Sequence, residues 1–312
     1  MPERSSIVKG NLLPNAKFPK NWFHRPFDIR RPHPYHLPRP EPPAEEEMIV
    51  TTGVGFKCED GLVLASDTQF TGAWKLRGEK LFEIKHSDAL RVCMAGAGRV
   101  SLIRKAVEIV GKTLPSACDK LSDTQEVLEN ALTRIFDKYV NPSLSPDEKR
   151  ASLELLVGIW SSKEGFALLQ TEEKVATWVE DYGVVGTGGA LVQYIVETLR
   201  GYGSTTEDAK YLASYAVKMA KGYDQYSGKE TRIKVLHSDG RIQTISAEEI
   251  NSVEDCFEKL FEALRLLLVG LNMKSFPVDE DVEWMGDFKS VMLDFRERER
   301  KRREKQQKKP IG

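Results

Sequence analysis

Residues 51–71 read TTGVGFKCEDGLVLASDTQFT, and this stretch decides the fold class. It predicts two short strands, Thr52–Lys57 and Leu62–Ser66, joined by a turn at Glu59-Asp60-Gly61. The Asp-Gly dipeptide carries the prediction, because it is a strong short-range signal for a β-hairpin. The chain therefore enters a sheet close to residue 52.

Further strands and helices follow this hairpin in separate runs. Apolar residues recur at helical spacing in some segments and mark short strands in others. The expected order is strands at 80–84 and 90–95, helices at 101–114 and 124–139, strands at 153–160, 165–171 and 175–181, helices at 190–199 and 206–221, and a hairpin over 231–246 that turns at Asp239-Gly240. Thr205 and Thr206 are candidate N-caps of the last helix. Segregated runs predict an α+β fold with helices outside a sheet core.

Two segments of different composition flank this region, so we expect an arm at 1–50, a domain at 51–250 and a helical extension at 251–312. Ten of the fifteen prolines precede residue 44, and proline stops helices and sheet ladders. Aromatic residues among them favour an arm that packs on its own domain or a neighbouring subunit; a leader that is later removed fits equally well. The C-terminal part has an amphipathic helix at 252–271 and a basic tail, either a solvated helix end or a docking site for an acidic partner or nucleic acid.

Composition excludes several classes of protein. With 40% hydrophobic and 30% charged residues the chain is globular, and its apolar runs are far shorter than the about 20 residues of a membrane span. The start lacks a signal peptide, and four scattered cysteines without a CxxC pair fit neither a disulfide framework nor a zinc site. We expect a cytoplasmic protein without a membrane or metal partner, and the net charge of −1 argues against nucleic acid.

The usual catalytic motifs are missing from the sequence. It contains no GxSxG, HExxH, Walker loop or strand-flanked GxGxxG. His86 and His237 are the only histidines outside the arm, and neither lies near an obvious serine or cysteine nucleophile. The segment Gly186-Thr187-Gly188-Gly189 precedes a helix, where it could cradle a phosphate or simply allow close packing of strand and helix.

The opening stretch resembles the start of proteasome β subunits and of the bacterial HslV peptidase. The resemblance rests on motifs in the family's order, namely Thr51-Thr52-Gly53-Val54-Gly55, Asp60-Gly61, Ala65-Ser66-Asp67, Lys80, Met94-Ala95-Gly96-Ala97-Gly98, Gly186–Gly189 and Tyr223-Asp224-Gln225-Tyr226-Ser227-Gly228. It implies a four-layer αββα sandwich of the N-terminal-nucleophile hydrolase type, with extensions at both ends. It also implies threonine peptidase activity without a metal or organic cofactor.

Each motif position takes a role from the family. Thr51 matches the nucleophilic threonine, and Thr52 is one residue out of register. The partners that the resemblance assigns to it are acidic Asp67, catalytic Lys80, the oxyanion donor Gly96, and Asp224 with Ser227, which would support the α-amine. Two departures stand out: the loop before Lys80 is shorter than in archaeal β subunits, and Gly189 replaces a serine.

These roles form a workable mechanism. A threonine hydroxyl needs a base beside it, and a free α-amine on Thr51, with a reference pKa of about 7.7–8.0, can accept its proton. Paired with Asp67, the Lys80 ammonium would stabilise the alkoxide. Each residue also has a plainer interpretation. Asp67 and Lys80 could be an ordinary ion pair, the Asp-x-x-Ser-Gly run a turn or cap, and Gly96 a tight-turn glycine.

The resemblance also implies a substrate and an assembly. Pocket walls at Phe70, Gly78, Phe82 and Met94 are apolar, so we expect cleavage of polypeptides after large hydrophobic residues, with the Thr71 main chain binding the substrate backbone. The family implies homo- or hetero-oligomeric rings, with an ATPase or activator as a further partner.

Maturation is the step on which activity depends. Thr51 works only after the bond to Val50 is cut, and β-branched Val50 is more crowded than the glycine usual in the family. Residues 1–50 are then a propeptide of a zymogen or a permanent extension that blocks the site. Two alternatives stay open: a non-catalytic ring or scaffold subunit, and an amidase of the N-terminal-nucleophile type acting on a small amide.

Overall fold

The computed structural model describes residues 52–71, 75–85, 87–114, 120–142, 144–145, 153–199 and 205–272, together with residues 293, 297, 300, 301 and 304. The chain divides into two units, Met1–Ala44 and Glu45–Gly312, and all described residues belong to the second. The predicted arm, Thr51 and most of the basic tail lie outside the described residues.

The first sheet contains the predicted opening hairpin. Its five strands lie in the order β10-β1-β2-β11-β12, every neighbouring pair antiparallel. They are β1 (Gly53–Cys58), β2 (Gly61–Asp67), β10 (Tyr182–Val185), β11 (Thr231–His237) and β12 (Ile242–Thr244). Gly61 has φ +152°, and a Cβ there would lie 2.4 Å from the Leu236 carbonyl oxygen, so the Asp-Gly turn needs its glycine.

The second sheet also has five antiparallel strands, in the order β5-β6-β7-β8-β9. They are β5 (Leu81–Lys85), β6 (Leu90–Gly98), β7 (Leu153–Ser161), β8 (Gly165–Glu172) and β9 (Val175–Val179). A small hairpin of β3 (Gln69–Thr71) and β4 (Lys75–Arg77) connects the two sheets along the chain. Most predicted strands are confirmed, with ends that move by a few residues.

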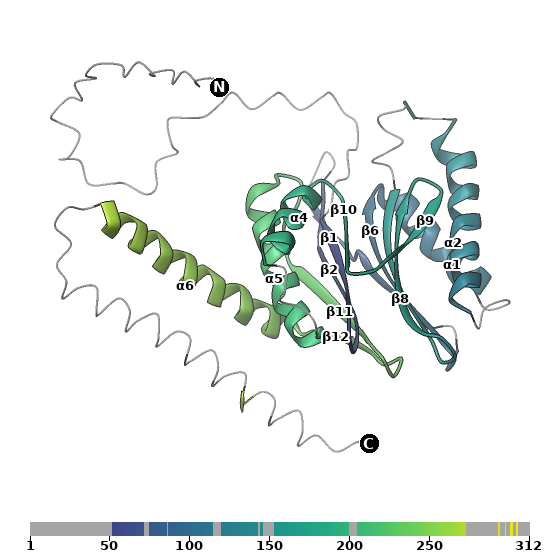
Figure 1. Cartoon of the computed structure of the whole chain (residues 1–312). Helices are drawn as coiled ribbons and strands as arrows, with labels where there is room; N and C mark the ends of the chain where they lie inside the picture. Colours follow the sequence, from purple (N-terminus) through teal and green to yellow (C-terminus); the bar gives the residue numbers. More distant parts are fainter. Residues whose placement is uncertain are drawn as a thin grey trace, which may run out of the picture. The chain divides into compact units, whose positions relative to one another are not determined.

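Two pairs of helices cover the outer faces of the sheets (Figure 1). The pair on the second sheet is α1 (Val100–Thr113) and α2 (Leu121–Ile135), and α2 continues into a π-helical turn, η3 (Phe136–Val140). The pair on the first sheet is α4 (Gly189–Thr198) and α5 (Thr206–Tyr223). Thr205 caps α5, since its side chain accepts a hydrogen bond from Asp208 N. Thr206 instead donates to the Asp60 carboxylate.

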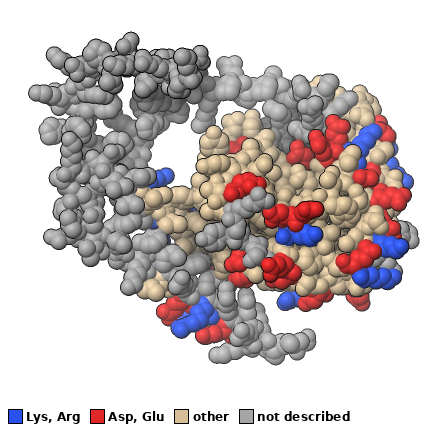
Figure 2. Space-filling view, viewed as in Figure 1, with Lys and Arg blue, Asp and Glu red and all other residues tan. Residues whose placement is uncertain are grey.

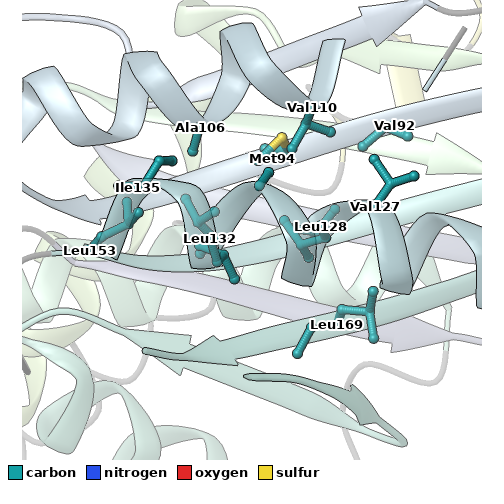
Figure 3. Close-up of a cluster of buried hydrophobic side chains, with 14 of the residues drawn as sticks. Val92, Met94, Ala106, Val110, Val127, Leu128, Leu132, Ile135, Leu153 and Leu169 are labelled. Carbon is teal, nitrogen blue, oxygen red and sulfur yellow. The ribbon is translucent and has the colours of Figure 1, made fainter. Parts of the chain in front are cut away.

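Strand alternation divides the interior into three apolar layers. Along β6, Met94 faces α1 and α2, where it joins the cluster drawn in Figure 3, and Ala95 faces the first sheet. A third cluster lies between the first sheet and helices α4 and α5. Helix, sheet, sheet and helix are therefore stacked in that order, and the predicted four-layer αββα sandwich is confirmed.

The C-terminal helix α6 (Ala247–Asn272) begins five residues before the predicted start at residue 252. In its first turns Ile250 joins the apolar cluster between the first sheet and helices α4 and α5, and Val253 is also buried. Lys218 and Lys221 of α5 form ion pairs of 2.7 Å with Glu258 and Glu254 of α6. The predicted division at residue 250 falls inside this helix and stays a prediction.

Charged side chains of both signs lie side by side on the face shown in Figure 2. Exposed ion pairs such as Lys112–Glu108 contribute little to stability, about 0–1 kcal/mol each. No helix within the described residues is both long and apolar enough to cross a membrane.

Candidate active site

A buried ion pair lies at the end of β2. Asp67 is the last residue of that strand, and its Oδ1 lies 2.9 Å from Nζ of Lys80, the residue just before β5. Both side chains are 0% exposed. The interpretation of this pair as an ordinary surface ion pair is therefore wrong, because no solvent reaches it.

Four donors surround the Asp67 carboxylate. Its Oδ1 accepts from Thr52 N (3.1 Å) and Lys80 Nζ, and its Oδ2 accepts from the backbone N–H groups of Gln69 (3.0 Å) and Gly228 (2.9 Å). Hydrogen bonds to the ionised form hold a carboxylate charged in a buried place. Asp67 thus ties the start of β1, the β3 hairpin and the loop after α5 to one point.

The Lys80 ammonium is held in an environment that opposes its charge. Burial lowers the pKa of Lys80, and the adjacent carboxylate of Asp67 counteracts that effect. The ring centroid of Phe70 lies 4.8 Å from Lys80 Nζ, within the range of a cation–π contact. An ammonium with a lowered pKa beside a reacting hydroxyl is suited to stabilise an alkoxide.

A hydrogen-bond chain runs from Thr52 to Asp224. Ser227 Oγ donates to Asp224 Oδ2 over 2.7 Å, so the 2.6 Å contact between Thr52 Oγ1 and Ser227 Oγ has the Thr52 hydroxyl as donor. Thr187 Oγ1 donates to the same Oδ2 over 2.8 Å. The two members of the Asp-x-x-Ser-Gly run are thus brought beside the start of β1, and their support of the Thr51 amine stays a prediction.

The glycine-rich segment packs directly against this chain. A Cβ on Gly188 would lie 1.9 Å from Thr52 Oγ1, closer than any contact permits. Gly186 has φ +87°, and Gly189 begins α4. Close packing accounts for Gly188 and the left-handed backbone for Gly186, whereas a Cβ on Gly189 would lie an ordinary 3.6 Å from Val184.

The backbone N–H of Gly96, which the resemblance assigns to the oxyanion, already has a hydrogen-bond acceptor. Its N–H donates to the Lys80 carbonyl over 3.1 Å, which extends the β5–β6 ladder by one pair. A Cβ would lie 2.5 Å from Ile103, so the glycine allows α1 to approach. An oxyanion would have to share this N–H with the Lys80 carbonyl, and the donor role of Gly96 stays a prediction.

The predicted pocket residues form two groups. Phe70 covers Gly78, where a Cβ would lie 2.3 Å from the ring, and only 7% of Phe70 is exposed. Phe82 and Met94 are cross-strand partners on β5 and β6, and both pack in the layer beneath α1 and α2. The side chain of Thr71 lies outside the described residues. That these groups line a substrate pocket stays a prediction.

Three residues near the site were not identified from the sequence. Thr52 and Thr187 join the hydrogen-bond chain, and Gln69 Nε2 donates to the Tyr226 carbonyl over 3.1 Å, which holds the loop of Ser227. Thr52 and Thr187 could have been found because they lie inside the motifs themselves. Nothing in the sequence marks Gln69, since its contact spans 157 residues along the chain.

The described part of the chain contains no group of three or more His, Cys, Asp or Glu side chains that could hold a metal ion. Thr51, the predicted nucleophile, lies outside the described residues and directly precedes Thr52.

Known proteins resemble this chain in sequence and in fold. Residues 50–236 match the family described as "Proteasome subunit". A proteasome subunit beta of Methanosphaera stadtmanae is 30% identical over 217 residues, covering 67% of this chain and 97% of that protein. A proteasome subunit beta 2 of Pyrobaculum aerophilum is 26% identical, covering 63% and 93%. The solved structure of Anbu (ancestral beta-subunit) from Yersinia bercovieri has a similar fold, with a TM-score of 0.60, 13% identity, and coverage of 73% and 100%. The chain belongs to the proteasome subunit family.

Proposed function

We propose that this chain is a threonine-type endopeptidase subunit of a ring-forming, proteasome-like particle, and that Thr51 is its nucleophile. In this proposal the chain is a zymogen in the cytoplasm, and removal of residues 1–50 frees the amine of Thr51. Polypeptides cut after large hydrophobic residues are the substrates, and an ATPase or activator delivers them to a homo- or hetero-oligomeric ring.

One observation carries the proposal: a fully buried ammonium–carboxylate pair meets the first residues of β1. Burying two charges costs several kcal/mol per ion in desolvation, so a pair of this kind is weak as a stabilising device. It is suited to holding a charged lysine next to a reacting group. The Thr52 N–H and the Lys80 ammonium donate to the same oxygen of Asp67, so the pair lies at the start of β1.

Thr52 is a poor candidate for the nucleophile itself. It is 0% exposed, and its hydroxyl proton is donated to Ser227. A nucleophile must be reached by the substrate carbonyl within about 3–3.5 Å. We therefore assign the nucleophile to Thr51, an assignment that leaves the hydrogen bonds of Thr52 intact.

The proposed reaction has two halves. The Thr51 hydroxyl oxygen attacks the scissile carbonyl while the α-amine of Thr51 accepts the hydroxyl proton, and the tetrahedral intermediate expels the peptide amine, which takes that proton. Water then hydrolyses the ester and restores the threonine. Lys80 stabilises negative charge on the threonine oxygen, and Ser227 with Asp224 holds the start of β1 in place.

Intact mass spectrometry of the purified protein tests the first step. The proposal expects a chain that begins at Thr51, and a chain that begins at Thr52 would be lighter by one threonine. Turnover of peptides with a large hydrophobic residue before the cut tests the second step. Thr51→Ala should abolish this turnover.

Thr52→Val is the matched control, because it keeps the side-chain shape and removes only the bond to Ser227. We expect it to retain measurable turnover. Full activity in Thr51→Ala would contradict the proposal, and complete loss in Thr52→Val beside it would assign the nucleophile to Thr52.

A second candidate is a non-catalytic ring subunit. The bond from Gly96 N–H to the Lys80 carbonyl favours it, because the expected oxyanion donor is already engaged. This candidate expects a mass that still includes residues 1–50 and no labelling by inhibitors that react with N-terminal threonine.

A further inference from the structure

Strand β10 is an edge strand whose free side faces polar side chains of the other sheet. It pairs with β1 on one side only. On the other side, the amide of Gln170 donates to the Val184 carbonyl over 2.9 Å and accepts from Val184 N over 3.3 Å. Two residues on, Gly186 N donates to Glu154 Oε2 over 2.7 Å. Alternate residues of a strand point their backbone groups to the same edge, so Gln170 and Glu154 replace a missing neighbour strand.

Both side chains come from the inner face of the second sheet. On β7, Leu156 belongs to the layer between the sheets, and Glu154 two residues earlier shares that face. Across the strand pair, Leu156 faces Gln170. Glu154 is thus a carboxyl group placed between two sheets. Burial is the main cause that raises its pKa, and the bond from Gly186 N–H opposes this effect.

The bond from Gly186 holds the turn that leads into α4. Gly186 adopts φ +87°, a left-handed conformation. The next two residues reach the proposed site: Thr187 donates to Asp224, and Gly188 packs on the Thr52 hydroxyl. Movement of Gly186 would therefore shift the contacts of both Asp224 and Thr52.

We propose that Glu154 is a positioning residue for the proposed peptidase site. Its carboxylate fixes Gly186, and through the Gly186–Gly189 turn it fixes the hydrogen-bond chain from Thr52 to Asp224. This inference deepens the proposed function and rests on it. The hydrogen bond of Glu154 goes to Gly186 rather than to the ion pair or the hydroxyl chain, so its effect is indirect.

Hydrogen exchange of the full chain tests the structural part without any need for activity. Glu154→Leu should speed exchange of the backbone amides of residues 186–189 by about ten-fold, as expected for the loss of one charge-assisted hydrogen bond. Glu154→Gln keeps an acceptor at the same reach, and its exchange should stay within about three-fold of the parent protein.

Glu129→Leu is the matched control. Glu129 Oε1 accepts from Ala176 N over 3.0 Å on β9, the edge strand of the second sheet, so this variant breaks the same kind of bond away from the site. It should speed exchange around residue 176 and leave residues 186–189 unchanged.

Peptide turnover tests the functional part. Glu154→Leu should lower kcat by about ten-fold or more with KM within about two-fold, because misplaced catalytic groups weaken the transition state rather than substrate binding. Glu154→Gln should restore most of kcat, and Glu129→Leu should leave both constants unchanged.

Unchanged exchange at residues 186–189 in Glu154→Leu overturns the inference, and so does an equal loss of kcat in the Leu and Gln variants. If Glu154→Leu does not fold, Glu154→Asp replaces it, since its carboxylate is about 1.5 Å too short to keep the bond. If exchange is faster in Glu154→Leu but the parent protein cleaves no peptide, the proposed function fails while Glu154 still holds the turn.

Discussion

Removing either member of the Asp67–Lys80 pair should destabilise the protein, and the two removals should differ. Lys80→Met leaves the Asp67 carboxylate with three of its four donors, the N–H groups of Thr52, Gln69 and Gly228. Removing one partner of a buried ion pair lowers the free energy of unfolding by about 3–5 kcal/mol. Because three donors still stabilise the Asp67 carboxylate, we expect Lys80→Met to lie at the lower end, about 3 kcal/mol.

Asp67→Ala should cost more. It leaves the Lys80 ammonium without its counter-ion and three backbone N–H groups without their acceptor. Each buried donor without a partner costs about 1–3 kcal/mol. Deprotonating a lysine with the reference pKa of about 10.4 costs about 4–5 kcal/mol at pH 7. The penalty for burying the unpaired charge cannot exceed this value, because Lys80 would otherwise lose its proton. We expect a total of about 5 kcal/mol or more.

Urea unfolding followed by circular dichroism at pH 7 and one protein concentration measures both values. Arg77→Met is the control, because it breaks the exposed 2.7 Å pair with Glu230 beside the same hairpin and should cost less than about 1 kcal/mol. If Lys80→Met costs as much as Asp67→Ala, or if both cost less than about 1 kcal/mol, the reasoning from these four hydrogen bonds is refuted.

Three further predictions follow from single contacts. Gly188→Ala should destabilise by about 1–3 kcal/mol or more in urea unfolding, because its Cβ would lie 1.9 Å from Thr52 Oγ1; a neutral effect would contradict the packing described. Thr205→Ala should cost about 0.5–2 kcal/mol through loss of the α5 cap, with Thr205→Ser as the control that keeps it. Burial raises the pKa of Glu154, so the carboxyl favours folding below its unfolded pKa and loses that contribution as pH rises through the folded value. The free energy of unfolding of the parent protein minus that of Glu154→Gln should therefore fall as pH rises from 4.5 toward neutrality, and a constant difference would show that Glu154 titrates normally.

Much of the fold could be predicted from local patterns. The Asp-Gly turn at residues 60–61, the cap at Thr205 and the helical spacing of apolar residues depend on neighbours in the chain, so the sequence marks them directly. Element ends were less accurate. Helix α6 begins at Ala247 rather than residue 252, because Ser246 caps it by accepting a hydrogen bond from Glu249 N, a local signal that the predicted start did not use.

The candidate site, like the fold, could be predicted from the sequence only in part. Asp67, Lys80, Asp224 and Ser227 could be named from the sequence because each lies in a motif of family-like order. Their burial could not be predicted, and it decides whether Asp67 and Lys80 form a weak surface pair or an ammonium held without solvent. The same holds for Gly96, whose N–H is engaged by Lys80 through the β5–β6 register.

By itself, the sequence determined the hairpin, the segregated order of strands and helices, the motif residues and the family, since these depend on residue type and spacing along the chain. Only the tertiary structure decided that Thr52 is buried against Ser227, that Gln69 holds the loop after α5, and that Glu154 reaches the free edge of β10. These contacts join residues 32 to 175 positions apart, and their strength depends on water being excluded where two sheets meet.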